Sequence, residues 1–312
     1  MAENRMAVVG VGATGSVLAA ALLSKYPETV LVGRRPDLAK ARKEKSITIS
    51  GAMDYRVQVK NCCSNIGELK DLSPTIIFLC TKTFHLADVL EKLQDVVVPG
   101  TKIICTQNGL GPEDLIADKF GEETVFRMSL NYGAVITNHG ETETAFFNRP
   151  NHLGCLSLEN RELGLQIAGM LNDCDLDTEF VDDIKMFVWK KMIMKCTMAS
   201  ICAVTNKTIK AALEYPPTRE IADTCFKEAL AVAKAMGYDL GEDYLKKALS
   251  YLEKVGGHKD SMCFDIENET PTEIDFLGAK IVGYARERSV PTPFYVTMTN
   301  LVKAIEDNYL VK

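Results

Sequence analysis

The sequence is poor in metal-ligating histidines and in runs of positive charge. Its 312 residues include only four histidines, His85, His139, His152 and His258, and no two of them stand at a close ligand spacing. A structural zinc site is therefore not expected, and no metal is assigned. The formal net charge is −6 at pH 7, with no long basic run. This balance argues against nucleic acid as a principal partner and favours a small-molecule ligand.

Long apolar runs are also missing. The longest one near the N-terminus, residues 17–23, is too short to span a bilayer, so no membrane partner is expected. The ten cysteines lie mostly in apolar segments, with no CxxC pair and no secretory leader. That usage fits core packing in a reducing, cytoplasmic location better than a disulfide framework. With 46% hydrophobic and 25% charged residues, the chain is long enough for two globular domains.

A glycine-rich turn, GVGATG, lies between a predicted strand at residues 6–9 and an apolar helix that runs to about residue 24. In a dinucleotide-binding fold the three glycines provide the tight turn, the approach of a pyrophosphate to the backbone, and the close packing of helix on strand. The helix N-terminus then faces the phosphates. The alternative is a tight turn with no ligand. The predicted cofactor-binding residues are Gly10, Gly12, Ala13, Thr14 and Gly15.

The end of the second predicted strand, residues 29–32, bears on the choice of cofactor. Arg34 and Arg35 follow it, where an NAD-binding fold places an acidic residue on the ribose 2′-hydroxyl. Because guanidinium groups suit a 2′-phosphate, NADP(H) is the favoured cofactor. In the alternative reading Asp37 reaches the ribose and the arginines are solvated, which would suit NAD(H).

Polar side chains follow two further predicted strands, residues 75–80 and 102–106. Lys82 comes two residues after the first of these strands, and Asn108 comes two residues after the second. Ligands of open α/β sheets bind beyond the carboxyl ends of the strands, so both residues are candidates for contact with cofactor or substrate. For Asn108, an Asn-Gly turn without a binding role is an equally good interpretation.

The order of the elements predicts an α/β fold: an N-terminal Rossmann dinucleotide-binding domain over residues 1–181 and an all-α C-terminal domain over residues 182–312. Residues 46–50 and 55–60 predict a hairpin. The alternating segments between residues 124 and 158 are expected to finish the sheet as antiparallel strands. Helices are predicted at residues 36–45, 85–93, 161–172, 183–205, 217–236, 242–254, about 272–288, and 294–308.

The stretch 189–206, WKKMIMKCTMASICAVTN, predicts a helix that is apolar on almost every face. At about 3.6 residues per turn, Lys191, Lys195 and Ala199 share one side of it. Because lysine is seldom buried without a partner, this strip is a candidate site for an anion. The alternative is that both lysines reach water.

Four ordered segments resemble the ketopantoate reductase family, over nearly the whole chain. The resemblance implies an NADPH-dependent reductase that converts ketopantoate, a branched 2-oxo acid, to pantoate, a D-2-hydroxy acid. It also implies a Rossmann domain, a helical second domain and a homodimer. The matching segments are GVGATG at 10–15, TK at 81–82 with QNG at 107–109, WKK at 189–191 and SMCFDIENETPTEID at 261–275.

The same resemblance implies roles for particular residues. Lys191 is the implied proton donor, Glu273 its counter-charge, and Ser261 a hydrogen-bonding partner of the substrate carboxylate. Lys195, one turn from Lys191, would either depress the pKa of Lys191 by like-charge repulsion or bind the substrate carboxylate. The residues implied on the cofactor side are Arg34, Lys82 and Asn108.

Three predicted substrate-binding positions depart from the family pattern. Lys195, Ala199 and His258 stand where the family usually has asparagine. Losing such hydrogen-bonding groups erodes selectivity for a substrate hydroxyl, and a more apolar pocket suits bulky or aromatic 2-oxo acids. This resembles the D-mandelate or D-2-hydroxyacid dehydrogenase branch of the same family, whose members use NAD(H). A dinucleotide-sensing regulator without catalysis is the competing class.

Overall fold

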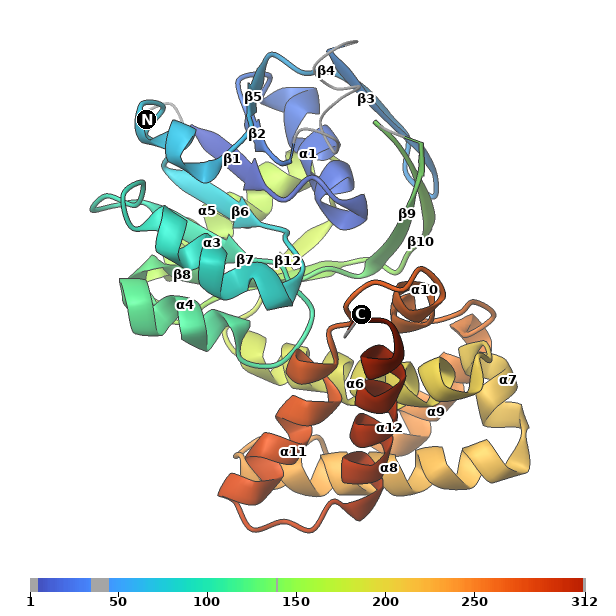
Figure 1. Ribbon diagram of the computed structural model, residues 1–312. Helices are drawn as coiled ribbons and strands as arrows, with labels where there is room; N and C mark the ends of the chain where they lie inside the picture. Colours follow the sequence, from blue (N-terminus) through green and yellow to red (C-terminus); the bar gives the residue numbers. More distant parts are fainter. Residues whose placement is uncertain (1–4, 35–44, 139, 311–312) are drawn as a thin grey trace. The chain divides into compact units, whose positions relative to one another are not determined.

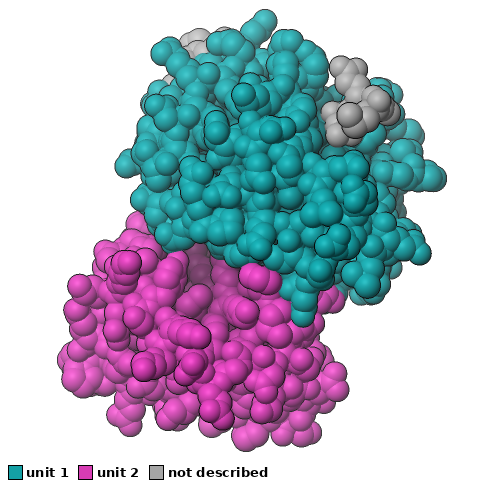
Figure 2. All heavy atoms as spheres, turned by 180° about the vertical axis from the view of Figure 1, so that it is seen from behind, with its two compact units in different colours: residues 1–107, 111–184 teal, residues 108–110, 185–312 magenta. Residues whose placement is uncertain are grey.

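The computed structural model (Figure 1) describes residues 5–34, 45–138 and 140–310. It contains two compact units, one of residues 1–107 and 111–184 and the other of residues 108–110 and 185–312 (Figure 2). The first is α/β and the second is helical, which confirms the predicted fold class. The predicted domain limits at residues 181 and 182 stay a prediction. Arg35, Asp37 and most of the helix predicted at residues 36–45 lie outside the described residues.

The first unit is built on an eight-stranded sheet in which β1 lies between β6 and β2. Neighbouring strands are parallel from β5 to β8, whereas β11 is antiparallel to β8 and parallel to β12. In register, Val9 of β1 pairs with both Val32 and Leu79. In spatial order the strands are β12 (Thr178–Phe180), β11 (Asn151–Cys155), β8 (Val125–Ser129), β7 (Lys102–Cys105), β6 (Ile76–Leu79), β1 (Met6–Val9), β2 (Val30–Val32) and β5 (Asn61–Cys63).

Alternation along β1 divides the core of this unit into two layers. Successive side chains of a strand point to opposite faces of the sheet, and all four residues of β1 are buried. Met6 and Val8 join the core that includes helices α1 (Ala13–Lys25) and α5 (Arg161–Asp173). Ala7 and Val9 join the opposite core, with α3 (Leu86–Leu93) and α4 (Pro112–Phe120). Both faces of the sheet are therefore covered (Figure 1).

A second, four-stranded sheet covers the other side of α1 (Figure 1). The predicted hairpin is confirmed as antiparallel β3 and β4, but the expectation that all strands of residues 124–158 finish the main sheet is wrong for β9 and β10. Nine successive residues of helix α1, residues 15–23, are buried. The helix is therefore covered on more than one side. The sheet order is β4 (Tyr55–Gln58), β3 (Ser46–Gly51), β10 (Glu141–Phe147) and β9 (Tyr132–Asn138).

The second unit is a bundle of helices. Two short helices, α7 and α10, have too few turns to show a period and were not predicted. The helix predicted at about residues 272–288 is instead η5 (Ile274–Phe276) and α11, because Leu277 leaves helical geometry at φ −108° and ψ −103°. The helices are α6 (Ile184–Thr205), α7 (Ile209–Glu214), α8 (Pro216–Ala235), α9 (Tyr244–Val255), α10 (Ser261–Glu267), α11 (Gly278–Glu287) and α12 (Pro293–Leu310).

Short 3₁₀ turns connect several elements of the first unit. They are η1 (Ile66–Lys70), η2 (Thr83–His85), η3 (Glu122–Thr124) and η4 (Leu158–Asn160). Among the described helices of either unit, none combines the length and the apolar character that crossing a membrane requires.

The single tryptophan fixes the orientation of α6 in the bundle. Trp189 is 4% exposed and stacks on Tyr238 with ring centroids 5.4 Å apart. Its centroid also lies 5.8 Å from that of Tyr284 on α11. Two residues along a helix correspond to a rotation of about 200°. With Trp189 packed into the bundle, Lys191 is therefore turned to the opposite side of α6.

Candidate active site

Two glycines of the GVGATG turn are required by close backbone contacts. Gly10 has φ +97°, and a Cβ atom there would lie 2.6 Å from the backbone nitrogen of Thr81. A Cβ atom on Gly15 would lie 1.9 Å from the carbonyl oxygen of Gly10. These contacts bring the start of α1 against the ends of β1 and β6, as the predicted turn requires.

Gly12 has the opposite surroundings, with open space where a side chain would stand. A Cβ atom there would meet no atom of the described residues within 4 Å. Gly12 is the N-cap of α1, with Ala13 and Thr14 in the first turn, and this turn carries no acidic residue. A helix N-terminus offers unpaired amides and a positive dipole end. The turn therefore fits the pyrophosphate of a dinucleotide.

The carboxyl ends of the central strands meet at one edge of the sheet. The pairs Val9–Val32, Val9–Leu79 and Leu79–Cys105 align the ends of β2, β1, β6 and β7. Arg34 is exposed beyond β2, and Lys82 is half-buried beyond β6. These two predicted cofactor-binding residues therefore extend from the same edge as the glycine turn.

A buried polar network that the sequence did not predict lies beneath these strand ends. The amide Nε2 of Gln107 lies 3.4 Å from Thr81 Oγ1, and Cys105 Sγ donates to Gln107 Oε1 over 3.0 Å. Burial raises the pKa of Cys105 to about 11, so its thiol keeps the proton that it donates. Arg127 Nη1 donates to the Cys105 carbonyl oxygen over 3.2 Å. On its other side, Arg127 forms an ion pair with Glu113, 3.2 Å from Nε to Oε2.

Lys191 contacts Asn108 within the helical unit. The Lys191 ammonium donates to Asn108 Oδ1 over 3.1 Å. Residues 108–110 are held to this unit by backbone contacts as well: Gly109 N lies 3.1 Å from Met192 Sδ, and Leu110 N donates to Phe276 O over 3.1 Å. The Asn-Gly turn is therefore present, and it also carries Asn108 to Lys191. The predicted cofactor contact of Asn108 stays a prediction.

Lys195 is paired with a carboxylate in the structure. This pairing bears on its predicted role of repelling the charge of Lys191. The Lys195 ammonium donates to both carboxylate oxygens of Asp260 over 2.7 Å and to Ser261 Oγ over 2.8 Å. Burial lowers the pKa of Lys195, but the charge and hydrogen bonds of Asp260 outweigh burial and raise it above its ordinary value. Asp260 balances the charge of Lys195, which weakens any like-charge repulsion on Lys191. Both predicted roles of Lys195 stay predictions. Sequence reasoning missed Asp260.

Ser261 and Glu273 lie close to this ion pair. Asp260, and not Ser261, caps helix α10 by accepting from Met262 N over 2.9 Å. Ser261 is exposed and accepts from Lys195, so its own O–H is available to donate to a substrate. Glu273 is 8% exposed, and its charge also raises the pKa of Lys195. The predicted pairing of Glu273 with Lys191 stays a prediction.

The two remaining predicted substrate residues are Ala199 and His258. Ala199 is 0% exposed, so its neighbours cover it completely. Its contact with a substrate stays a prediction. His258 is exposed in the loop after α9, and its ring Nδ1 lies 3.2 Å from the carbonyl oxygen of Val255. Its contact with a substrate stays a prediction.

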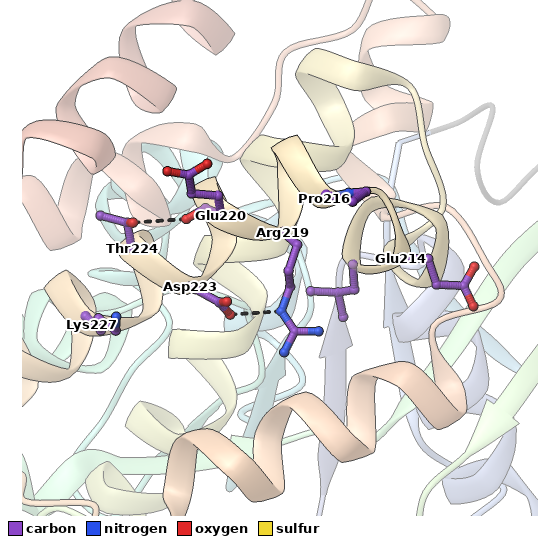
Figure 3. Close-up of a pocket in the computed structure, with 8 residues that line it drawn as sticks. Glu214, Pro216, Arg219, Glu220, Asp223, Thr224 and Lys227 are labelled. Atoms are coloured by element: carbon purple, nitrogen blue, oxygen red, sulfur yellow. Dashed lines mark hydrogen bonds and ion pairs between the residues drawn. The ribbon is translucent and has the colours of Figure 1, made fainter.

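A hollow of about 550 Å³ lies along α7 and α8, apart from the residues discussed above (Figure 3). Arg219 is one of the two basic residues that line it, with Lys227. Its guanidinium is engaged by Asp223 and Glu253, each with a 2.9 Å contact. The hollow is polar and its arginine is neutralised, so it is a poor candidate for an anionic substrate.

The chain combines a Rossmann unit that has an open glycine turn with a helical unit that has a polar lysine cluster, and this combination is that of a nicotinamide dinucleotide-dependent oxidoreductase. The family can also be stated. The model described as "Ketopantoate reductase PanE/ApbA" matches residues 6–157, and "Ketopantoate reductase PanE/ApbA C terminal" matches residues 183–306. The chain belongs to the ketopantoate reductase family, which confirms the resemblance, and it is an oxidoreductase of that family.

Full-length relatives agree with this assignment. The chain is 25% identical to a 2-dehydropantoate 2-reductase of Streptococcus pyogenes, over 96% of this chain and 97% of the relative. It is 26% identical to one of Pyrococcus abyssi over the same shares. Among solved structures, D-mandelate dehydrogenase with NADH and anilino(oxo)acetate has a TM-score of 0.89 at 23% identity, covering 99% of this chain and 100% of that one. The Geobacter metallireducens 2-dehydropantoate 2-reductase has a TM-score of 0.88 at 23% identity, covering 96% and 99%.

Proposed function

We propose that this chain reduces a branched 2-oxo acid to the D-2-hydroxy acid, as a 2-dehydropantoate 2-reductase that converts ketopantoate to pantoate. The observation that carries the proposal is the Lys191–Asn108 contact of 3.1 Å in the helical unit. It holds the Lys191 ammonium on the side of α6 that faces away from the packed Trp189. The open turn at Gly12 leaves space for the pyrophosphate of the dinucleotide.

The reaction needs a hydride at C2 and a proton at the carbonyl oxygen. The bound nicotinamide dinucleotide supplies the hydride. Lys191 donates a proton from Nζ to the oxygen of the forming alkoxide, and the neutral amine then takes a proton from water. Asn108 Oδ1 accepts a hydrogen bond from the same ammonium, which orients the remaining N–H bonds. General acid catalysis of this kind contributes about 10²–10⁴ in rate.

A second candidate is a D-mandelate-type dehydrogenase that acts on bulky or aromatic 2-oxo acids with NAD(H). Lys195 and Ala199 favour it, because neither provides the asparagine amides of the family pattern. The solved D-mandelate dehydrogenase complex is similar to this chain in fold. The dinucleotide-sensing regulator is less well supported, since a sensor does not need the charged cluster around Lys195.

A substrate panel tests the proposal directly. Purified protein is incubated with NADPH or NADH and with ketopantoate or phenylglyoxylate, and cofactor oxidation is followed by absorbance. We expect oxidation with at least one 2-oxo acid, fastest with ketopantoate. Faster turnover of phenylglyoxylate would favour the mandelate-type enzyme. No oxidation under any condition would favour the regulator.

We further propose NADP(H) as the preferred cofactor, on the basis of Arg34. This side chain is exposed two residues beyond β2, on the sheet edge that carries the glycine turn. A hydrogen bond to a charged group is worth about 1.5–3 kcal/mol. Arg34→Ala should therefore raise the KM for NADPH by about ten- to a hundredfold and change the KM for NADH little. Equal changes in the two KM values would show that Arg34 does not read the 2′-phosphate.

The partners that we propose are a small 2-oxo acid or 2-hydroxy acid and a second copy of the chain. One of the solved structures similar to this chain is that of a dimeric ketopantoate reductase from Staphylococcus aureus. The homodimer and the cytoplasmic location stay proposals for this chain.

A further inference from the structure

The ammonium of Lys195 has three N–H donors, and the described residues provide an acceptor for each. Two donors reach the carboxylate oxygens of Asp260 over 2.7 Å, and the third reaches Ser261 Oγ over 2.8 Å. The carboxylate is itself fixed in place, because Asp260 Oδ1 also accepts from Met262 N. A substrate carboxylate can bind Lys195 only by displacing one of these acceptors.

The charges around Lys195 are balanced before any substrate arrives. The side chain of Lys195 is 16% exposed and that of Asp260 is 6% exposed, so their ion pair is poorly screened. Glu273 and Asp265 add negative potential at Lys195, since both raise its pKa. With Lys191 one turn away on α6, two ammonium groups stand among carboxylates. A carboxylate brought to the Lys195 ammonium would therefore meet the fixed negative charge of Asp260.

We propose that Asp260 is a specificity residue that restricts the enzyme to 2-oxo acids with a single carboxylate. The inference rests on the proposed function. By neutralising Lys195, Asp260 removes the cation that would otherwise bind the distal carboxylate of a 2-oxo dicarboxylic acid. It also places a fixed negative charge there, and like charges brought together select against the wrong ligand.

Asp260→Asn tests this with little change of shape. Asparagine caps helices as well as aspartate does, so the bond from Met262 N is retained while Lys195 loses its counter-charge. We compare kcat/KM for 2-oxoglutarate with kcat/KM for 2-oxoisovalerate. The ratio of dicarboxylate to monocarboxylate should rise about ten- to a hundredfold, the value of a charge-assisted hydrogen bond.

A second variant moves the ratio in the opposite direction. Lys195→Gln removes the cation and leaves Asp260 charged, so the ratio should fall below that of the wild type. The two variants are expected to change the ratio in opposite directions. If one of them fails to fold, the other still tests the proposal. The matched control is Asp223→Asn on α8, which removes a carboxylate from a pair with Arg219 that is more exposed. It should leave the ratio unchanged.

The outcomes separate this inference from the proposed function. If the wild type reduces neither substrate nor ketopantoate, the proposed function fails. Another outcome is that the wild type reduces 2-oxoisovalerate, while folded Asp260→Asn and Lys195→Gln show the same dicarboxylate-to-monocarboxylate ratio of kcat/KM as the wild type. That result overturns only the role of Asp260. A wild type that already prefers 2-oxoglutarate would also overturn that role.

Discussion

Replacing Lys191 with alanine is expected to lower kcat by about 10²–10⁴, the contribution of a well-placed general acid. The ammonium lies 3.1 Å from Asn108 Oδ1, and alanine has no proton to give to the forming alkoxide. The glycine turn and Arg34 belong to the other unit, so affinity for NADPH should change little. Steady-state kinetics give kcat, and fluorescence titration gives the affinity for NADPH.

Lys190→Ala is the matched control for this prediction. It removes the same charge from the adjacent position on α6, where Lys190 Nζ lies 5.0 Å from the centroid of the Phe187 ring. Its kcat should stay within a few-fold of the wild type. Near-normal turnover by Lys191→Ala, or an equal loss in Lys190→Ala, would remove Lys191 from the proposed chemistry.

The sequence predicted those parts of the site that depend on short segments. The GVGATG turn and the strand ends at Lys82 and Asn108 follow from local patterns. Helical spacing placed Lys191 and Lys195 on one side of α6, because a period of 3.6 residues needs only the helix itself. What each of these side chains contacts could not be read in the same way.

Asp260 shows why the partner of Lys195 was missed. The two residues are 65 positions apart, and Asp260 precedes α10, a helix of seven residues that has no clear period. In the sequence Asp260 is one of 42 acidic residues, and it stands in a short polar loop. Only the packing of α10 near α6 makes it the counter-charge of Lys195.

Arg127 was missed for a different reason. It stands in the alternating segment VFRMS, where a polar residue normally faces solvent on one side of a strand. Strand β8 is internal, between β7 and β11, and all five of its residues are buried. Arg127 therefore points into the protein, where Glu113 of α4 meets it.

Breaking the Arg127–Glu113 pair is expected to lower the free energy of unfolding by about 3–5 kcal/mol, because removing one partner leaves an uncompensated buried charge. The two side chains are only 2% and 4% exposed. Arg127→Met is the variant of choice, and urea unfolding followed by circular dichroism measures the change. The only tryptophan, Trp189, belongs to the helical unit, so its fluorescence should report a smaller shift than circular dichroism does.

Two further variants decide whether charge is the cause. Adding Glu113→Leu to Arg127→Met should restore most of the lost stability, since an apolar pair can replace a buried ion pair at little or no cost. Arg161→Met breaks an ion pair with Asp182 whose side chains are 53% and 65% exposed, and it should cost about 0–1 kcal/mol. If the double variant is no more stable than Arg127→Met, the loss comes from packing and not from charge.

The same variants test whether the network positions the cofactor. Arg127 reaches Thr81 through Cys105 and Gln107, and Thr81 packs against Gly10 of the dinucleotide turn. A purely structural pair would leave the affinity for NADPH unchanged in protein that is still folded. We expect Arg127→Met to weaken that affinity below its unfolding transition, and Arg161→Met to leave it unaltered. The double variant Arg127→Met with Glu113→Leu could regain its stability and still bind NADPH weakly. Arg127 would then orient the strand ends as well as stabilise the core.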